Sequence, residues 1–314
     1  MVNRNLSPKG ELSIELRIES LTKAYGKKVA LKDFSATLSN GIYGLLGPNG
    51  AGKSTMMKII TENLSADKGQ ILVDGVPSSE MGAAYRSLLG YMPQQQGMYP
   101  HFTARRFLYY IAGLKGMSKA QAEEEIERAA AMVNMTEHLD KRLGTYSGGM
   151  KQRILIAQAV LGSPKILILD EPTAGLDPKE RIRIRNLISQ ISLDRIVILA
   201  THVVSDVEYI AKEIIMLKNG ELVSQLRPSA LLQQMKGKVF EICVPEDRVD
   251  GVQDTYLVGN IRMDDEDRIW VRVIDDQKPQ WDMVQEVLPS LEDVYLYTFE
   301  ERTPGERKIE ICCG

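Results

Sequence analysis

Nine consecutive residues, Gly47-Pro48-Asn49-Gly50-Ala51-Gly52-Lys53-Ser54-Thr55, constrain this chain more than any other feature. They fit the pattern G-x-x-x-x-G-K-[ST] and lie between a predicted strand, 42–46, and a predicted helix, 55–63. Glycines let the backbone wrap closely around phosphate groups, and the N-terminus of the following helix offers partially positive N–H groups. We expect Lys53 to reach the β- and γ-phosphates of a nucleotide and Ser54 to hold Mg²⁺. The stretch therefore predicts a nucleotide-binding site.

Length, charge and hydropathy limit the classes of protein to which the chain can belong. Its 314 residues suffice for one large domain or two of ordinary size. A formal net charge of −3 argues against a broad phosphate-neutralising surface for DNA or RNA. No run approaches the ~20 apolar residues that span a bilayer, and Met1-Val2-Asn3-Arg4 lacks the apolar core of a secretory signal. We therefore expect a cytoplasmic chain whose membrane role needs a separate partner.

Two continuous apolar runs predict strands that are buried on both faces of a sheet. Residues 165–170 and 195–200 are rich in Ile, Leu and Val, and helical patterns separate them. Such alternation is typical of a mostly parallel α/β sheet. Residues 14–38, before the phosphate-binding loop, predict a meander of strands instead, beginning with alternating apolar and polar side chains.

A helical insert is predicted over about 95–162, between the phosphate-binding loop and the strand at 165–170. Ser118 and Gln121 have the spacing of a capping box, and helix formers follow them. A second insert helix is predicted from about Gly148 to Leu161. We expect the first domain, 1–226, to combine these parts in a single nucleotide-binding domain.

The pattern changes after Leu226. Alternating runs predict strands at 238–244 and 268–274, and 280–288 predicts a helix. Together they indicate a small α+β accessory domain over 227–314, with the last dozen residues frayed. A regulatory, a dimerising and a bracing role all remain open for it.

Acidic and imidazole side chains follow the two predicted core strands. Asp170 ends the first strand, Glu171 comes next, and His202 follows the second strand. The carboxyl ends of parallel strands face the crevice in which ligands bind. We expect Asp170 to hold the hydration shell of Mg²⁺ beside Ser54, and Glu171 to activate water against the γ-phosphate. His202 would contact that phosphate or orient the water. Taken alone, Asp170-Glu171 could simply begin a polar turn, and His202 could be a structural histidine.

A second anion-binding site, which we call the tip of the insert, is predicted at the N-terminus of the second insert helix. Ser147 suits a helix N-cap, and Gly148 and Gly149 expose N–H groups at the positive end of the helix. An ordinary cap without a ligand is the simpler alternative. The tip is far in sequence from the phosphate-binding loop, and a second copy of the protein could bring it across to close the site.

These residues together resemble the nucleotide-binding subunit of the ATP-binding cassette (ABC) transporter family, over roughly 14–226. The motifs are a Walker A loop at 47–55, a signature YSGGM at 146–150, a Walker B strand at 166–171, a D-loop at 174–177 and a switch histidine, His202. The resemblance adds Gln94 as a ligand of the metal near the reaction centre, Asp177 near the nucleotide, and Tyr25 as the aromatic that stacks on adenine. A plain core or surface tyrosine is the alternative for Tyr25. The implied fold is a P-loop (RecA-like) core with an antiparallel β subdomain and a helical insert.

The signature departs from the commonest family form, LSGGQ, because Tyr146 and Met150 replace its two ends. The resemblance implies that the phosphate contacts come from Ser147 and Gly149, so ATP binding is still expected. It further implies that two subunits, identical or different, sandwich two ATP molecules with Mg²⁺ head to tail. Each ATP would touch Walker A of one subunit and Ser147, Gly148 and Gly149 of the other. Closure would drive a separate transmembrane permease, with this subunit bound peripherally at the cytoplasmic face of the membrane.

Two further stretches gain meaning from the resemblance. Residues 97–103 correspond to the region that meets a coupling helix of the membrane subunit, although their Met, Tyr and Phe side chains are equally suited to burial inside the insert. Residues 289–295, PSLEDVY, resemble the tail of many exporters and favour export over import.

Two other classes of function are alternatives to a transporter ATPase. A soluble ATPase of the same superfamily, acting on nucleic acid or ribosomes, is the main alternative. Ribosome-associated members usually carry two cassettes in one chain, whereas this chain has one phosphate-binding loop. A regulatory module that no longer hydrolyses ATP is disfavoured by Glu171 and His202. We therefore expect no nucleic acid partner, and nothing in the chain identifies the cargo.

Overall fold

The computed structural model describes residues 14–94 and 97–300, so the predicted frayed tail lies outside the described residues. The chain divides into two compact units, Met1–Gln225 and Leu226–Gly314. Within the described ranges, no helix is both long enough and apolar enough to cross a bilayer.

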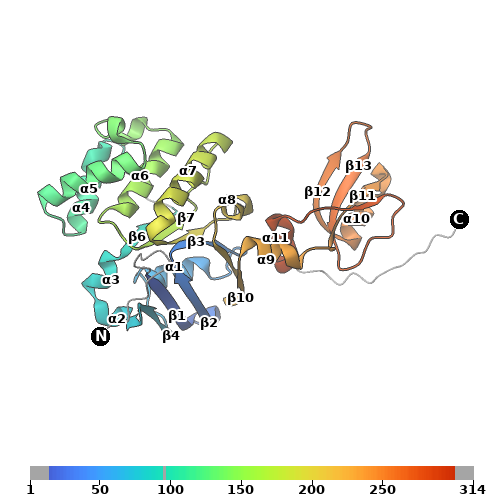
Figure 1. The fold of residues 1–314 in the computed structure, drawn as a ribbon, viewed down its shortest axis with the longest axis horizontal. Helices are drawn as coiled ribbons and strands as arrows, with labels where there is room; N and C mark the ends of the chain where they lie inside the picture. The colour runs from blue at the N-terminus through green and yellow to red at the C-terminus, as the bar shows by residue number, and fades with distance from the viewer. Residues whose placement is uncertain (1–13, 95–96, 301–314) are drawn as a thin grey trace. The chain divides into compact units, whose positions relative to one another are not determined.

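A six-stranded sheet forms the centre of the first unit, in the order β10-β9-β3-β8-β7-β6. The strands are β3 (Gly41–Leu46), β6 (Leu89–Met92), β7 (Ile166–Asp170), β8 (Ile196–Ala200), β9 (Glu213–Lys218) and β10 (Glu221–Leu226). All strands from β9 to β6 in this order pair in parallel. β8 is buried throughout and β7 is buried up to its last residue, which confirms both predicted core strands. Helices cover the two faces of this sheet, with α1 on one side and α6 and α7 on the other (Figure 1).

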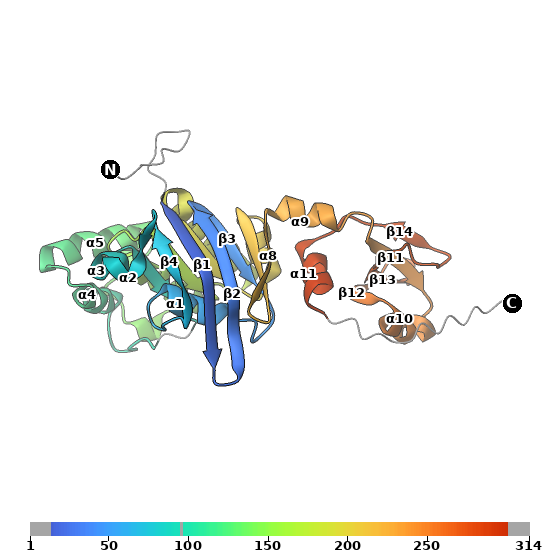
Figure 2. The same ribbon diagram turned by 90° about the horizontal axis from the view of Figure 1, so that it is seen from below.

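An antiparallel sheet, β2-β1-β4-β5, provides the predicted meander. Its strands are β1 (Glu15–Tyr25), β2 (Lys28–Ser39), β4 (Lys68–Val73) and β5 (Val76–Pro77). Of these, β1, β2 and β4 appear beside α1 in Figure 2. Helix α1 (Lys53–Ile60) buries four side chains in a core that both sheets share: Met56, Met57, Ile59 and Ile60. The short helices α2 (Ser78–Met81) and α3 (Ala83–Ser87) connect this sheet to β6. Packing against two sheets therefore anchors the helix that follows the phosphate-binding loop.

Three helices pack together as the helical insert: α4 (Ala104–Leu114), α5 (Lys119–Met132) and α6 (Gly148–Val160). Two 3₁₀ turns, η1 (Thr136–His138) and η2 (Leu143–Thr145), join α5 to α6. The predicted capping box is confirmed, because the backbone N–H of Gln121 donates to Ser118 Oγ at 3.3 Å and the Ser118 N–H donates to Gln121 Oε1 at 3.0 Å. Beyond the insert, α7 (Pro178–Ile191) and η3 (Ser192–Asp194) lead to β8, and α8 (Val204–Glu208) follows it.

The second unit is built on an antiparallel sheet, β12-β13-β11-β14. Its strands are β11 (Val239–Val244), β12 (Leu257–Met263), β13 (Ile269–Ile274) and β14 (Val284–Glu286). Its helices are α9 (Pro228–Gln234), η4 (Glu246–Arg248), α10 (Val249–Thr255) and α11 (Leu291–Phe299). Side chains such as Ile242, Val271 and Val252 form a small core between the sheet and α10. The predicted strands at 238–244 and 268–274 are thus confirmed.

The helix predicted at 280–288 is wrong. This segment contains β14 instead, in which Val284 pairs opposite Ile242 at the edge of β11. Val284 and Trp281 pack against the small core, so strand pairing and burial outweigh the helical pattern of the segment. The helix begins later, where Ser290 and Asp293 form the capping box of α11.

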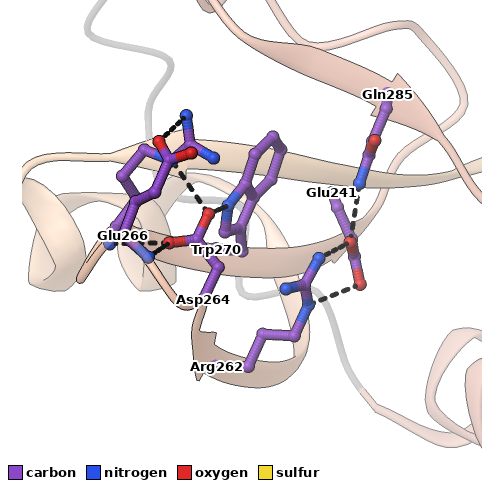
Figure 3. Close-up of polar contacts among 7 residues, drawn as sticks. Glu241, Arg262, Asp264, Glu266, Trp270 and Gln285 are labelled. Carbon is purple, nitrogen blue, oxygen red and sulfur yellow. Dashed lines mark hydrogen bonds and ion pairs between the residues drawn. The ribbon is translucent and has the colours of Figure 1, made fainter.

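Polar side chains line one face of the same sheet. Arg262 lies opposite Trp270 in the β12–β13 pair, and Glu241 lies opposite Gln285 in the β11–β14 pair. Arg262 Nη2 and Gln285 Nε2 donate to Glu241 Oε2 at 2.6 and 2.9 Å, as Figure 3 shows. Trp270 Nε1 donates to Asp264 Oδ2 at 2.8 Å, and this bond is the largest cause holding the pKa of Asp264 well below its ordinary value. The carboxylates of Glu241 and Asp264 thus accept hydrogen bonds from side chains on neighbouring strands.

Candidate active site

The phosphate-binding loop joins β3 to α1, and its shape requires glycine at Gly52. This residue is the N-cap of α1 with φ 111°, and a Cβ there would lie 2.4 Å from the carbonyl oxygen of Ala30. No side chain caps the first N–H groups of α1. The loop therefore presents backbone donors and the positive end of the helix to an anion.

Lys53 is the first residue of α1, and its ammonium points back into the loop. Nζ donates to the carbonyl oxygens of Gly47 and Pro48, the latter at 3.0 Å. Burial lowers the pKa of Lys53, while the nearby carboxylates of Glu171 and Asp170 act in the opposite direction. A partly buried ammonium at the positive N-terminal end of α1 is suited to an anionic phosphate.

Asp170 and Gln94 come together at the end of the parallel sheet. Asp170 closes β7, and the backbone N–H of Gln94, just beyond β6, donates to its carboxylate. Burial raises the pKa of Asp170, the charge of Glu171 raises it further, and the bond from Gln94 and the charge of Lys53 oppose these effects. Adjacent parallel strands thus bring predicted residues from distant motifs to one edge.

Glu171 and His202 make two polar contacts with each other. Nδ1 of His202 lies 2.8 Å from Oε2 of Glu171, and the backbone N–H of His202 donates to Oε1 at 3.0 Å. The Glu171 side chain is 10% exposed and that of His202 is 69% exposed, so the carboxylate is sheltered while the imidazole faces outward. Glu171 has φ 54°, an uncommon conformation for a residue with a side chain, and its N–H donates to Ala200 O at 2.8 Å.

Thr201 is a site residue that the sequence analysis missed. Its hydroxyl lies 3.3 Å from Glu171 Oε2 and accepts from the N–H of Val203 at 3.0 Å. The side chain therefore fixes both the carboxylate and the turn that carries His202. A hydroxyl residue immediately before the histidine was the available signal.

The predicted tip of the insert forms at the start of α6. Ser147 is the N-cap, and its Oγ accepts from the N–H of Met150 at 3.3 Å. Ser147 and Gly148 are exposed. Tyr146 is buried and donates to His138 O, and burial raises its pKa to about 12. The unusual first residue of the signature therefore packs inside the insert rather than facing a ligand.

The remaining predicted residues lie apart from the Lys53–Glu171–His202 group. Asp177 caps α7 by accepting from the N–H of Glu180 at 2.9 Å and is exposed. Tyr25 ends β1 at the hairpin to β2 and is 49% exposed. In the described parts of the chain, no hydrogen bond or ion pair joins Tyr25, Ser147 or Asp177 to that group.

Comparison with known proteins identifies the family. The model of the family described as "ABC transporter" matches residues 31–174. An uncharacterised ABC transporter ATP-binding protein of Bacillus subtilis, YxlF, is 38% identical over 232 residues, which are 74% of this chain and 77% of that protein. The Nod factor export ATP-binding protein I of Bradyrhizobium diazoefficiens is 30% identical over 298 residues, covering 90% of this chain and 96% of that protein. The chain belongs to the ABC transporter ATP-binding proteins.

A further relative and a solved structure agree with this family. The linearmycin resistance ATP-binding protein LnrL of Bacillus subtilis is 33% identical over 78% of each chain. The solved structure of an ATP-binding subunit of an ABC transporter covers 70% of this chain and 92% of its own, with a TM-score of 0.61 and 26% identity. This chain is therefore the ATP-binding subunit of an ABC transporter and an ATPase, and its fold is the ABC ATPase fold with an additional C-terminal sheet.

Proposed function

We propose that Glu171 is the general base of ATP hydrolysis and that His202 holds it in position. The observation that carries this proposal is the paired contact between His202 and Glu171, at the sheet edge where Lys53 and Asp170 also lie. Glu171 would take the proton from the attacking water, and the exposed His202 would reach the γ-phosphate. Lys53 would bind the β- and γ-phosphates, and Tyr25 would stack on adenine at the hairpin.

Mg²⁺ is part of the same proposal. The hydroxyl of Ser54, the carboxylate of Asp170 and the amide of Gln94 are oxygen donors of the kind that this cation prefers. Asp170 fits this role because its partly buried carboxylate lies beside a second acid, where a cation would relieve both desolvation and repulsion. When bound, Mg²⁺ would neutralise charge on the β- and γ-phosphates.

We place the second half of the nucleotide site on another subunit. Ser147, Gly148 and Asp177 are exposed and make no hydrogen bond to their own phosphate-binding loop among the described residues. A head-to-tail pair of subunits, identical or different, would bring these tips against the γ-phosphate of the partner. Gly149 would let the backbone approach that phosphate.

The membrane partner would be a separate permease that binds the helical insert. Tyr99, Tyr110 and Leu114 are exposed by 51%, 47% and 69%, and the rings of Tyr99 and Phe102 lie 4.8 Å apart. Arg106 lies over the Phe102 ring at 4.1 Å. An exposed aromatic patch of this kind supports protein docking, and it would hold the subunit peripherally at the cytoplasmic face of the membrane. Export of a compound, as the name of the Nod factor export ATP-binding protein I states for that protein, is the proposed direction of transport.

Mixing two inactive variants tests the shared site. Lys53→Ala damages the phosphate-binding loop, and Ser147→Ala damages the tip. In a head-to-tail pair formed from one copy of each, one composite site keeps an intact Lys53 and an intact Ser147. We expect the mixture of full chains to recover ATPase activity that neither variant shows alone. A mixture as inactive as its components contradicts a site shared between two copies of this chain.

A further inference from the structure

A buried side-chain bond links the turn after Glu171 to the helix after His202. The hydroxyl of Thr173 donates to the carboxylate of Asp206, and each residue is 1% exposed. Thr173 follows Glu171 by two residues, and Asp206 follows His202 by four residues at the middle of α8. The two segments that supply the proposed catalytic pair are therefore joined a second time, underneath the site.

Arg185 on α7 completes this connection. Its Nη1 lies 4.0 Å from Asp206 Oδ1 and donates to the backbone oxygen of Ser205 at 3.0 Å. Its guanidinium also lies 5.9 Å from the centre of the Tyr209 ring. Because α7 begins directly after the D-loop, three segments of the site converge on Asp206.

The choice of residues argues for more than packing. A buried carboxylate is costly unless it is paired and fully hydrogen-bonded, and Oδ1 of Asp206 makes no hydrogen bond to any residue that the structure describes. The neighbouring Val204 and Val207 are also buried, so the polar partners of the Asp206 carboxylate are Thr173 and Arg185. An apolar residue at position 206 could not make a directional hydrogen bond with Thr173.

We propose that Asp206 is a positioning residue for ATP hydrolysis, acting through Thr173 to keep the Glu171 turn and the His202 loop in register. This inference rests on the proposed role of Glu171. Without the Thr173–Asp206 bond, the two segments can shift relative to each other while the phosphate-binding loop stays intact. A misplacement of about 1 Å in a catalytic group costs about 10²-fold in rate.

Substitutions at Thr173 provide the sharpest test. Thr173→Val keeps the shape and removes the hydroxyl, whereas Thr173→Ser keeps the hydroxyl. In the full chain we expect Thr173→Val to lower kcat by roughly 10- to 100-fold with ATP affinity within about two-fold of wild type. Thr173→Ser should restore most of that rate. Asp206→Ala should resemble Thr173→Val, and the double variant should be no slower than either one, because one interaction is lost once.

Two controls separate positioning from general destabilisation. Asp194→Asn removes ion pairs with Arg195 and Lys165 before β8, at the end away from His202. It should leave kcat unchanged even if it lowers the melting temperature. If Thr173→Val does not fold, Asp206→Asn replaces it as the test, because the amide keeps an acceptor oxygen for Thr173. We expect Asp206→Asn to lower kcat by roughly 3- to 10-fold, since a hydrogen bond to a neutral amide is weaker than one to a carboxylate.

The outcomes distinguish the two proposals. If Glu171→Gln is inactive while Thr173→Val or Asp206→Asn turns over at the wild-type rate, the positioning role of Asp206 is overturned and the role of Glu171 stands. If Glu171→Gln itself turns over normally, the proposed function fails first. A loss of ATP affinity equal to the loss of kcat in Thr173→Val also overturns the inference.

Discussion

Oε2 of Glu171 lies 2.8 Å from Nδ1 of His202, although 31 residues separate them in the chain. The contact joins the ends of β7 and β8, which pair in parallel, and Asp170 pairs directly with Ala200. The neighbouring backbone bond from His202 to the other carboxylate oxygen fixes the orientation of Glu171. This pair is the basis of the first prediction.

Glu171→Gln should bind ATP and hardly hydrolyse it. The amide keeps the shape of the side chain and an acceptor for the His202 N–H, but it cannot accept the proton of water. Loss of a general base costs about 10²–10⁴ in rate. Single-turnover hydrolysis and equilibrium ATP binding measure the two effects separately. Glu221→Gln, in which the lost carboxylate pairs with Lys32 on the surface, is the control and should hydrolyse ATP normally.

Lys53→Ala should weaken ATP binding itself. The ammonium is partly buried inside the loop, and a hydrogen bond to a charged group contributes about 1.5–3 kcal/mol, or roughly 10- to 150-fold in Kd. Titration calorimetry with ATP measures this change. Lys119→Ala removes an exposed lysine from the same helical position, the first residue of α5, and should leave Kd unchanged. Equal Kd values for the two variants would contradict the assignment of Lys53.

Two glycine-to-alanine substitutions should have opposite effects. A Cβ at Gly149 would lie 2.7 Å from Glu180 Oε2, a carboxylate that Arg153 holds at 2.7 Å. Gly149→Ala should displace Glu180, cost about 1 kcal/mol of ion pairing and reduce ATPase activity by disturbing the tip. Gly113 in α4 has open space around its Cβ position, so Gly113→Ala should raise the free energy of unfolding by about 0.5–1 kcal/mol.

Denaturant unfolding and ATPase assays of both glycine variants provide the measurement. A Gly149→Ala protein with wild-type activity and a gain in stability equal to that of Gly113→Ala would show that Glu180 does not restrict the tip.

The Asp264–Trp270 bond should persist to unusually low pH. The folded pKa of Asp264 is well below its ordinary value of 3.8, chiefly because of the bond from Trp270. A lowered carboxyl pKa contributes stability that is present above 3.8 and is lost as the pH falls from there toward the folded pKa. The indole N–H resonance of Trp270, assigned with a Trp281→Phe variant, should therefore shift only below pH 3.8. Asp264→Asn should remove this transition, and a midpoint above 3.8 would contradict the prediction.

The sequence by itself determined the local parts of this protein. The loop that ends in Lys53 requires glycine geometry and a following helix, and both are local properties. The capping box at Ser118 and the buried runs of β7 and β8 likewise depend on neighbouring residues and hydrophobic pattern alone. Asp170, Glu171 and His202 could be placed at one edge because parallel strands end together.

Only the tertiary structure decided which distant partners these parts acquired. The strand at Val284 replaced a predicted helix because pairing with Ile242 and burial outweigh local preference. The hydrogen bond between Thr173 and Asp206 joins residues 33 positions apart, and no hydrophobic periodicity in the sequence predicts it. Such contacts depend on how whole elements pack, since the energy of a buried polar group is set by its spatial neighbours rather than by its sequence.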